Sequence, residues 1–200
     1  MNVQAQIEEF YDVVIIGAGP VGGYLGWKFK ELGHTVLIVE EHSEIGRPFQ
    51  CAGLVNPGAM ERVPMKNTIL TPIWGARINS PNGTTVDIGS PERIRTWSVC
   101  RKKFDEGVVR LALESGADII LNSKPTKLDI EKDYAEISIN VGGDICKVRC
   151  DLVCGCDGAH SWVRRTMKMG RPKEMMIGYQ VEVTGYNGSS GQLDMFTGND

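Results

Sequence analysis

The feature that most constrains the fold is a glycine-rich turn between an apolar strand and a helix, near the start of the chain. Residues 13–16 form an unbroken β-branched run, which is typical of a parallel strand buried on both faces. GAGPVG follows at residues 17–22, and its Pro20 suits the first turn of a helix. Gly33 predicts the end of that helix, and residues 35–39 predict a second strand. The first forty residues therefore predict a β-α-β unit.

Each glycine of this turn has its own role in a dinucleotide site. Gly17 permits the tight turn, Gly19 lets the backbone approach a pyrophosphate, and Gly22 allows close helix–strand packing. The helix N-terminus offers free N–H groups and the positive end of its dipole to phosphates. Glu40, at the end of the second strand, would accept hydrogen bonds from ribose hydroxyls and repel a 2′-phosphate. The pattern favours FAD or NAD over NADP; the alternative is a turn used only for packing, with Glu40 solvated.

Composition narrows the function classes. The 200 residues have a formal net charge of -3 and contain no Lys/Arg block, so nucleic-acid binding is not expected. No apolar run reaches the ~20 residues of a membrane-spanning helix, and no export signal is visible. The six cysteines are expected to be reduced thiols in the cytosol. Because the last four lack the Cys-x2-Cys spacing of zinc and iron–sulfur sites, no metal is expected.

The rest of the chain alternates strand-like and helix-like patterns. The expected elements are a loop at 41–72, a β-meander at 73–99 turning at Asn82-Gly83, a helix at 101–115, a strand at 117–121, antiparallel strands within 126–150, a strand at 151–156, a short helix at 158–167 and strand-like residues from 177 to 200. The loop is too long for a mere connector, and long ordered loops tend to be functional.

Two segments resemble motifs of known flavoproteins. LVCGCDGAHSWVRR at 152–165 resembles the Asp-Gly motif of flavoprotein hydroxylases and their glutathione-reductase-like relatives, which implies that Asp157 and Gly158 lie beside FAD. RKKFD at 101–105 resembles a helix start of the same family, which implies that Arg101 contacts the phosphate and ribose region. From the residues alone, an Asp-Gly turn after a strand is common, and Arg101 reads as a surface cation that the helix dipole disfavours. The resemblance makes FAD the expected cofactor.

The loop after the second strand is similar to a segment of the geranylgeranyl reductase family. EIGRPFQCAGL at 44–54 matches the family signature Gly-x-Pro-x-x-Cys through Gly46, Pro48 and Cys51. The resemblance implies that the backbone of Cys51 and Ala52 touches the isoalloxazine ring. It also implies an enzyme that uses FAD to saturate isoprenoid double bonds, notably in archaeal membrane lipids.

The chemistry of alkene reduction suggests a role for Cys51. Flavin N5 supplies a hydride, and the other carbon needs a proton in a dry pocket. Burial would keep Cys51 protonated, because desolvation raises a thiol pKa from about 8.5. A thiol is a feeble acid toward an alkene carbon, so positioning of flavin or substrate, or a small buried hydrophobe, stay open as roles. Arg47 is a candidate partner of the pyrophosphate or of a substrate head group, and equally a solvated loop cation.

These expectations combine into one hypothesis. Residues 1–170 form a Rossmann-like α/β FAD-binding domain with a parallel sheet plus β-meander, and residues 171–200 begin an antiparallel, β-rich substrate domain. Because family members are longer, the chain reads as the N-terminal part of a protein, and we expect it to bind FAD poorly alone. The function would be reduction of isoprenoid lipid chains, with an NAD(P)H or ferredoxin-type electron donor, in the cytoplasm with peripheral membrane contact. An FAD-dependent aromatic-ring hydroxylase and a non-catalytic FAD-binding module are the alternatives.

Overall fold

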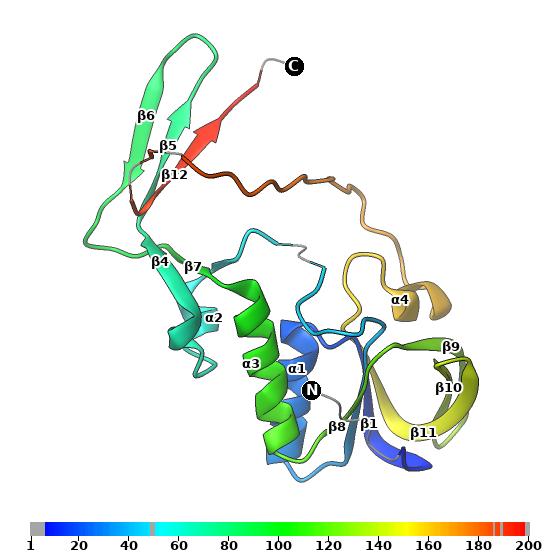
Figure 1. The fold of residues 1–200 in the computed structure, drawn as a ribbon. Helices are drawn as coiled ribbons and strands as arrows, with labels where there is room; N and C mark the ends of the chain where they lie inside the picture. Colours follow the sequence, from blue (N-terminus) through cyan, green and yellow to red (C-terminus); the bar gives the residue numbers. More distant parts are fainter. Residues whose placement is uncertain (1–6, 49–50, 186, 189, 199–200) are drawn as a thin grey trace. The chain divides into compact units, whose positions relative to one another are not determined.

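The chain forms two compact units that are interleaved along the sequence (Figure 1). The structure, a computed structural model, describes residues 7–48, 51–185, 187–188 and 190–198. The first unit comprises Met1–Pro48 and Lys102–Met175, and the second comprises Phe49–Arg101 and Met176–Asp200. Each unit is therefore built from two separate stretches of the chain.

A six-stranded sheet forms the centre of the first unit, in the order β8-β2-β1-β11-β10-β9. Strands β8, β2, β1 and β11 pair in parallel, whereas β10 pairs antiparallel with β11 and β9. The strands are β1 (Phe10–Ile16), β2 (Val36–Val39), β8 (Asp118–Ile120), β9 (Ser123–Ile130), β10 (Ala135–Val141) and β11 (Asp144–Gly155). The helices are α1 (Pro20–Glu31), α3 (Arg101–Glu114, its first residue belonging to the second unit) and α4 (Trp162–Thr166). This architecture confirms the predicted α/β, Rossmann-like fold class.

The two faces of β1 enter separate hydrophobic clusters, because successive side chains of a strand point to opposite faces. Val14 packs in the cluster that includes Ile137 of β10, whereas Ile15 packs in the cluster that includes Val109 of α3. All of these side chains are buried. Burying such a side chain contributes roughly 1.5–3 kcal/mol to stability, which is why the unbroken apolar run specifies a central strand.

Helix α1 packs against the core through glycines and through partly buried apolar side chains. Gly23 and Gly26 are buried, Leu25 and Phe29 are partly buried against the same cluster, and Val21 is 61% exposed. A Cβ on Gly23 would lie 2.9 Å from a methyl group of Val109, and one on Gly26 would lie 2.8 Å from the terminal methyl of Ile38. The glycines thus let α1 lie directly against α3 and β2, and Figure 1 shows the two helices side by side.

The second unit contains two three-stranded sheets, ordered β3-β7-β4 and β12-β5-β6. The strands are β3 (Leu54–Val55), β4 (Ile69–Ile73), β5 (Gly75–Asn79), β6 (Thr85–Gly89), β7 (Thr96–Val99) and β12 (Gln192–Phe196), with helix α2 (Pro57–Met60) and the 3-10 turn η1 (Lys66–Thr68). β6 pairs antiparallel with β5, as the hairpin turn predicted, and Gly83 adopts a φ of +86° there. β12 pairs parallel with β5, so this sheet is mixed rather than antiparallel.

The segment at 41–72 contains more regular structure than the sequence-based prediction of a loop. The expected loop at 41–72 contains β3, α2, η1 and the start of β4; α2 begins where the Asn56 side chain accepts a hydrogen bond from the Ala59 N–H at 2.8 Å, a start signal that the prediction missed. Residues 49 and 50 of that loop lie outside the described residues.

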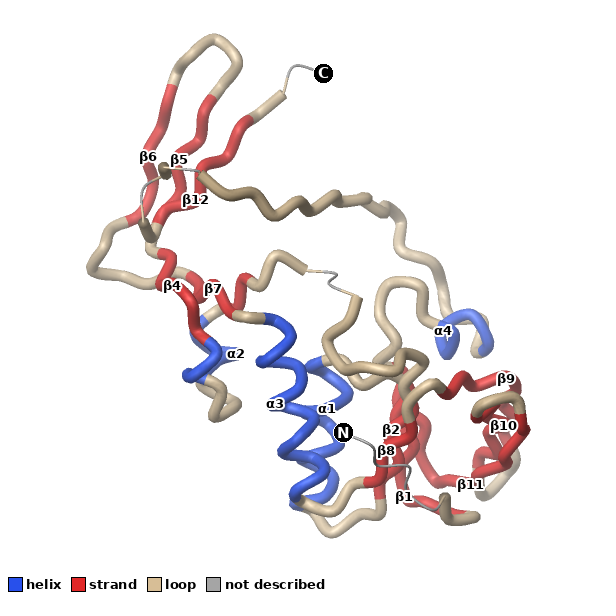
Figure 2. Tube along the Cα trace, viewed as in Figure 1, coloured by secondary structure: helices blue, strands red, loops and turns tan. Residues whose placement is uncertain are grey.

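The last of the antiparallel strands expected within 126–150 and the strand expected at 151–156 are continuous as β11, because its first half pairs with β10 and its second half with β1. Residues 177–185 form neither helix nor strand, and Figure 2 draws them as loop. The predicted domain boundary near residue 170 remains a prediction.

Candidate dinucleotide site

The glycine turn lies between the carboxyl ends of β2 and β11. The Gly17 N–H donates to the Val39 carbonyl at 2.8 Å, and the Cys156 N–H donates to the Ile16 carbonyl at 2.7 Å. Gly17 has a φ of +101°, and a Cβ there would lie 2.5 Å from the carbonyl oxygen of Cys156. Only glycine combines this backbone conformation with so close an approach, so the predicted role of Gly17 as the tight-turn residue agrees with its geometry.

The other two glycines of the motif have contrasting surroundings. A Cβ on Gly22 would lie 1.9 Å from the Gly17 carbonyl oxygen, whereas one on Gly19 would meet nothing within 4 Å. Gly19 is the N-cap of α1 and makes no side-chain capping bond, and Pro20 follows it. Gly22 is therefore required for packing, and the backbone beside Gly19 is open at a helix N-terminus, where an anion binds well.

The Glu40 carboxylate lies against this turn. Glu40 is 9% exposed, and its Oε2 accepts the N–H of Ala18 at 2.7 Å. Its Oε1 accepts the backbone N–H of His42 at 2.9 Å and lies 2.6 Å from Nδ1 of the same residue. The sequence predicted Glu40 at the end of the second strand, but it did not predict the contact between Glu40 and His42. The signal that could have indicated this contact is the spacing of two residues between Glu40 and His42, just after the strand ends.

Asp157 lies at the end of β11 beside the same turn, since its Cα would lie 3.0 Å from a Cβ on Gly17. Its Oδ2 accepts the N–H groups of Trp162 at 2.5 Å and Val163 at 3.0 Å, at the start of α4. Its Oδ1 is buried and accepts no hydrogen bond from the described part of the chain. A buried acceptor without a donor costs about 1–3 kcal/mol, so this oxygen suits a hydroxyl group of a ligand.

Gly158 and Cys156 flank that carboxylate. Gly158 has a φ of +73°, and a Cβ there would meet nothing within 4 Å. Burial raises the pKa of the Cys156 thiol to about 11, so it stays neutral near pH 7 and adds no negative charge beside the proposed phosphate site. The open backbone at Gly19, the turn that a Cβ would fill at Gly17 and Gly22, and the orphaned oxygen of Asp157 all fit a bound dinucleotide.

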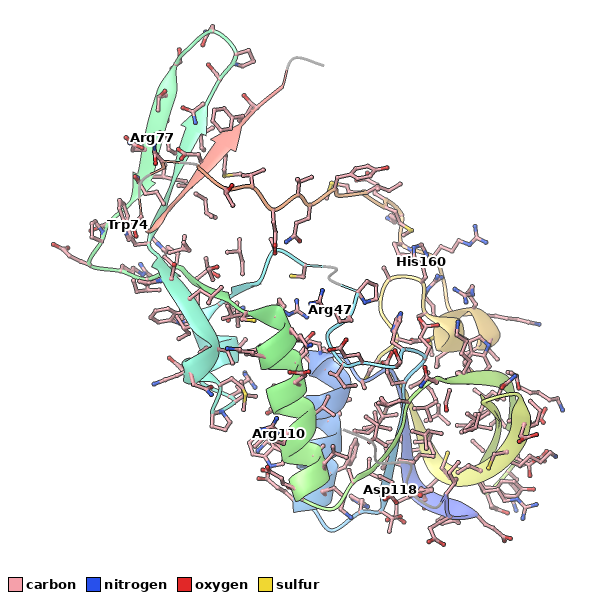
Figure 3. All side chains as sticks on the ribbon, in the orientation of Figure 1. Arg47, Trp74, Arg77, Arg110, Asp118 and His160 are labelled. Atoms are coloured by element: carbon pink, nitrogen blue, oxygen red, sulfur yellow. The ribbon has the colours of Figure 1, made fainter. Side chains whose placement is uncertain are left out.

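The loop after β2 is fixed to the start of α3 within the first unit. Gly46 has a φ of +73°, and a Cβ there would lie 3.0 Å from the Cα of Lys102. Lys102 forms an ion pair with Glu44, and this hydrogen-bonded contact lowers the pKa of the Glu44 carboxyl. Arg47 lies on this loop with an exposed side chain (Figure 3). Its contact with a pyrophosphate remains a prediction.

The predicted residues of the second unit form their own local group. Cys51 is exposed, and its sulfur accepts the Gly53 N–H at 3.5 Å. A Cβ on Gly53 would lie 3.4 Å from Cγ of Arg101, the first residue of α3. Ala52 is also exposed. The exposed side chain of Cys51 does not fit the reading of this residue as a small buried hydrophobe, and its contact with the isoalloxazine ring stays a prediction.

A parallel sheet with a glycine turn at one strand end and carboxylates at its two neighbouring strand ends defines a dinucleotide-binding α/β protein. The chain belongs to the FAD binding domain family, whose model matches residues 83–197. FAD is accordingly its cofactor, as predicted.

Curated relatives carry a more specific name. The chain is 36% identical over 167 residues to the digeranylgeranylglycerophospholipid reductase of Methanosarcina acetivorans, a match that covers 80% of this chain and 40% of the relative. It is 32% identical to digeranylgeranylglycerophospholipid reductase 3 of Methanosphaera stadtmanae, covering 86% of this chain and 46% of the relative. The chain thus spans about half the length of the curated relatives it matches or less.

Solved structures support the fold. A geranylgeranyl bacteriochlorophyll reductase-like protein from Thermoplasma acidophilum matches with a TM-score of 0.76 and 22% identity, covering 95% of this chain and 51% of that chain. An anhydrotetracycline hydroxylase from Streptomyces rimosus matches with a TM-score of 0.66 and 25% identity, covering 80% of this chain and 34% of that chain. In the described residues, no helix is both long and apolar enough to span a bilayer.

Proposed function

We propose that the chain is part of an FAD-dependent reductase that saturates carbon–carbon double bonds in the isoprenoid chains of membrane lipids. The observation that carries this proposal is a glycine turn flanked by the carboxylates of Glu40 and Asp157, in a chain that is 36% identical to a digeranylgeranylglycerophospholipid reductase. The loop signature of Gly46, Pro48 and Cys51 adds support, because it lies in the segment that resembles the geranylgeranyl reductase family.

The residues of the first unit would hold the cofactor. The N–H groups at the start of α1 and the open backbone at Gly19 face the diphosphate. Glu40 accepts the adenosine ribose hydroxyls, and the free Oδ1 of Asp157, with Gly158 beside it, accepts a hydroxyl from the flavin side of the molecule. FAD supplies the hydride when bound. Arg47 adds positive charge from the loop that follows β2.

The residues of the second unit would meet the phosphate and the ring. Arg101 would pair with the FAD phosphate, and an anion there would offset the unfavourable effect of a cation at a helix N-terminus. The backbone of Cys51 and Ala52 would contact the isoalloxazine ring. An exposed thiol that accepts the Gly53 N–H suits positioning of the ring better than proton donation to an alkene.

The location and partners follow from this substrate class. We propose a cytoplasmic protein that contacts the membrane surface to reach its lipid and takes electrons from an external donor of the NAD(P)H or ferredoxin type.

The direct test gives the full-length protein, loaded with FAD and reduced with dithionite, a geranylgeranyl lipid under anaerobic conditions. Mass spectrometry should show a gain of two hydrogen atoms for each double bond reduced. Gly19→Val, which places a side chain at the open backbone, should abolish both flavin binding and the mass gain. If the FAD-loaded wild-type protein produces no mass gain, the proposal of a reductase is wrong.

The second candidate is an aromatic-ring hydroxylase, which the match to an anhydrotetracycline hydroxylase at 25% identity favours. This activity would consume molecular oxygen and add one oxygen atom to a phenol. Oxygen uptake with a panel of phenols, in place of alkene saturation, would select it.

A further inference from the structure

The carboxylate of Glu40 has little acceptor capacity left. An ionised carboxylate oxygen offers two lone pairs and can only accept, so the short contact with Oε1 requires the proton to lie on Nδ1 of His42. The His42 backbone N–H occupies the other site on Oε1, and the Ala18 N–H occupies one site on Oε2. One lone pair remains.

A ribose diol brings two O–H donors to this carboxylate, so one of the present donors has to leave. The Ala18 N–H is fixed inside the glycine turn. The His42 N–H is fixed as well, because the Asn122 N–H donates to the His42 carbonyl at 3.1 Å and the Ser123 N–H donates to the Glu40 carbonyl at 2.9 Å. The imidazole is the donor that can leave by rotation about its side-chain bonds, because 39% of the side chain is exposed.

The two backbone donors already orient the carboxylate, one on each oxygen, so the imidazole is not needed to hold Glu40 in place. We propose that the His42 imidazole occupies the lone pair of Glu40 Oε1 to which the second ribose hydroxyl would donate, and that the adenosine ribose of FAD displaces the imidazole. His42 is then a determinant of cofactor affinity. This inference rests on the proposed function, in which Glu40 binds that ribose.

The displacement makes cofactor binding depend on pH. A charged imidazole forms a stronger hydrogen bond with a carboxylate than a neutral one. The other charged groups around the ring are Glu41, whose Oε1 lies 3.9 Å from Nε2 of His42, and Lys124 of β9, which pairs with Glu41 at 3.1 Å. FAD therefore competes with a stronger partner in acid, so its affinity should fall as the pH is lowered and the imidazole becomes charged.

The test titrates FAD-free, full-length protein with FAD at pH 5.5 and pH 7.5 and follows flavin fluorescence. His42→Ala should tighten FAD binding by about threefold at pH 7.5 and by about tenfold at pH 5.5, since a hydrogen bond from a charged donor is stronger than one from a neutral donor. His42→Gln keeps a donor that does not titrate, so the pH dependence contributed by His42 should disappear while the affinity at pH 7.5 stays near wild type.

Calorimetry in two buffers of different ionisation enthalpy should show proton release on binding for wild type, in the pH range over which its affinity changes, but not for either His42 variant. His34→Ala is the matched control, because His34 is an exposed histidine whose ring lies 3.8 Å from Asp12 and has no contact with Glu40 among the interactions described above. Its profile should match wild type.

The outcomes separate this inference from the proposed function. Weaker FAD binding by His42→Ala, or an unchanged pH profile in both His42 variants, would overturn the displacement while leaving FAD binding intact. If the wild-type protein binds FAD at neither pH, the proposed cofactor site is wrong, and both proposals fail with it.

Discussion

At the residue scale, the glycines of the turn differ in what a side chain would meet. A methyl group at Gly22 would overlap the Gly17 carbonyl, whereas a methyl group at Gly19 would enter open space beside the helix N-terminus. Gly22 is therefore required by the packing of the fold, whereas Gly19 leaves open the space through which a ligand would approach.

This difference predicts opposite phenotypes for two alanine variants. Gly22→Ala should lower the free energy of unfolding by about 1–3 kcal/mol, as overpacking does. Gly19→Ala should lower it by at most about 1 kcal/mol, because the methyl group meets nothing within 4 Å and the remaining cost is that of a less favourable N-cap residue. Gly19→Ala should nevertheless weaken FAD binding at least about tenfold, because its methyl group occupies the approach to the pyrophosphate. Urea denaturation and FAD titration measure the two effects; equal destabilisation by both variants would contradict the assignment.

Which site residues the sequence could reveal depends on how local their role is. The positions of Gly17, Gly22 and Glu40 could be predicted because they belong to one local strand–turn–helix–strand pattern. Asp157 was expected only from the resemblance to the Asp-Gly motif, and the contacts of all four residues with FAD stay predictions. The hydrogen bond between Glu40 and the His42 ring could not be predicted from the sequence, since it depends on how the chain turns after β2. The exposure of Cys51 could not be predicted, because burial of a loop residue depends on what packs over it rather than on the residues beside it.

At the scale of the elements, a side-chain hydrogen bond links β1 to β8 across the intervening strand β2. The Tyr11 hydroxyl donates to Asp118 Oδ2 at 2.9 Å and accepts the Glu8 N–H at 3.2 Å (Figure 3 labels Asp118). Burial, reinforced by the bond to Asp118, raises the pKa of Tyr11 to about 12. The folded state therefore holds this proton more tightly than the unfolded state.

The raised pKa predicts how stability changes in alkali. Below pH 10 the hydroxyl is protonated in both states, and its contribution to stability is fully present. Between pH 10 and about pH 12 the unfolded chain releases the proton first, so this contribution is lost as the pH rises. Tyr11→Phe should lower the free energy of unfolding by about 1 kcal/mol at pH 8 and reduce the loss of stability above pH 10. Tyr179→Phe, at a side chain that is 98% exposed, is the control for urea denaturation at several pH values.

A helix or strand was predictable where its sequence pattern is uniform along its length and it packs or pairs with a single neighbouring element. The ends of α1 and α3 agree with the pattern closely, because Gly33 and Gly116 mark where each helix stops. The buried face of α1 was predictable only in part, since Leu25 and Phe29 pack against the core but the buried glycines carry no hydrophobic signal. The unbroken length of β11 was missed because its two halves pair with different strands.

At the scale of the whole molecule, residues 170–185 connect the last part of the first unit to the last strand of the second. They form neither helix nor strand, and nearly all of their side chains are exposed. Stability is lowest where a segment has few packed contacts, and such segments are the preferred sites of proteolysis.

Limited trypsin digestion should therefore cut first after Lys173, since Arg171 precedes a proline and resists the enzyme. Lys173→Gln should slow this first cut, whereas Lys127→Gln, at an exposed lysine on β9, should leave its rate unchanged. The C-terminal fragment should stay bound after the cut, because β12 pairs with β5 over its full length. Mass spectrometry of the native and denatured digests checks both points, and early cleavage within β9 would contradict them.

The parallel pairing of β12 with β5 also orders events during synthesis on the ribosome. β5 and β6 emerge early, but the strand that completes their sheet is translated only after the remaining part of the first unit. The nascent chain thus carries an open sheet edge at β5 while α3, β8, β9, β10 and β11 are being made. An unpaired edge attracts other strands. Slow translation beyond residue 101 would therefore prolong the period in which the growing polypeptide needs a chaperone at that edge.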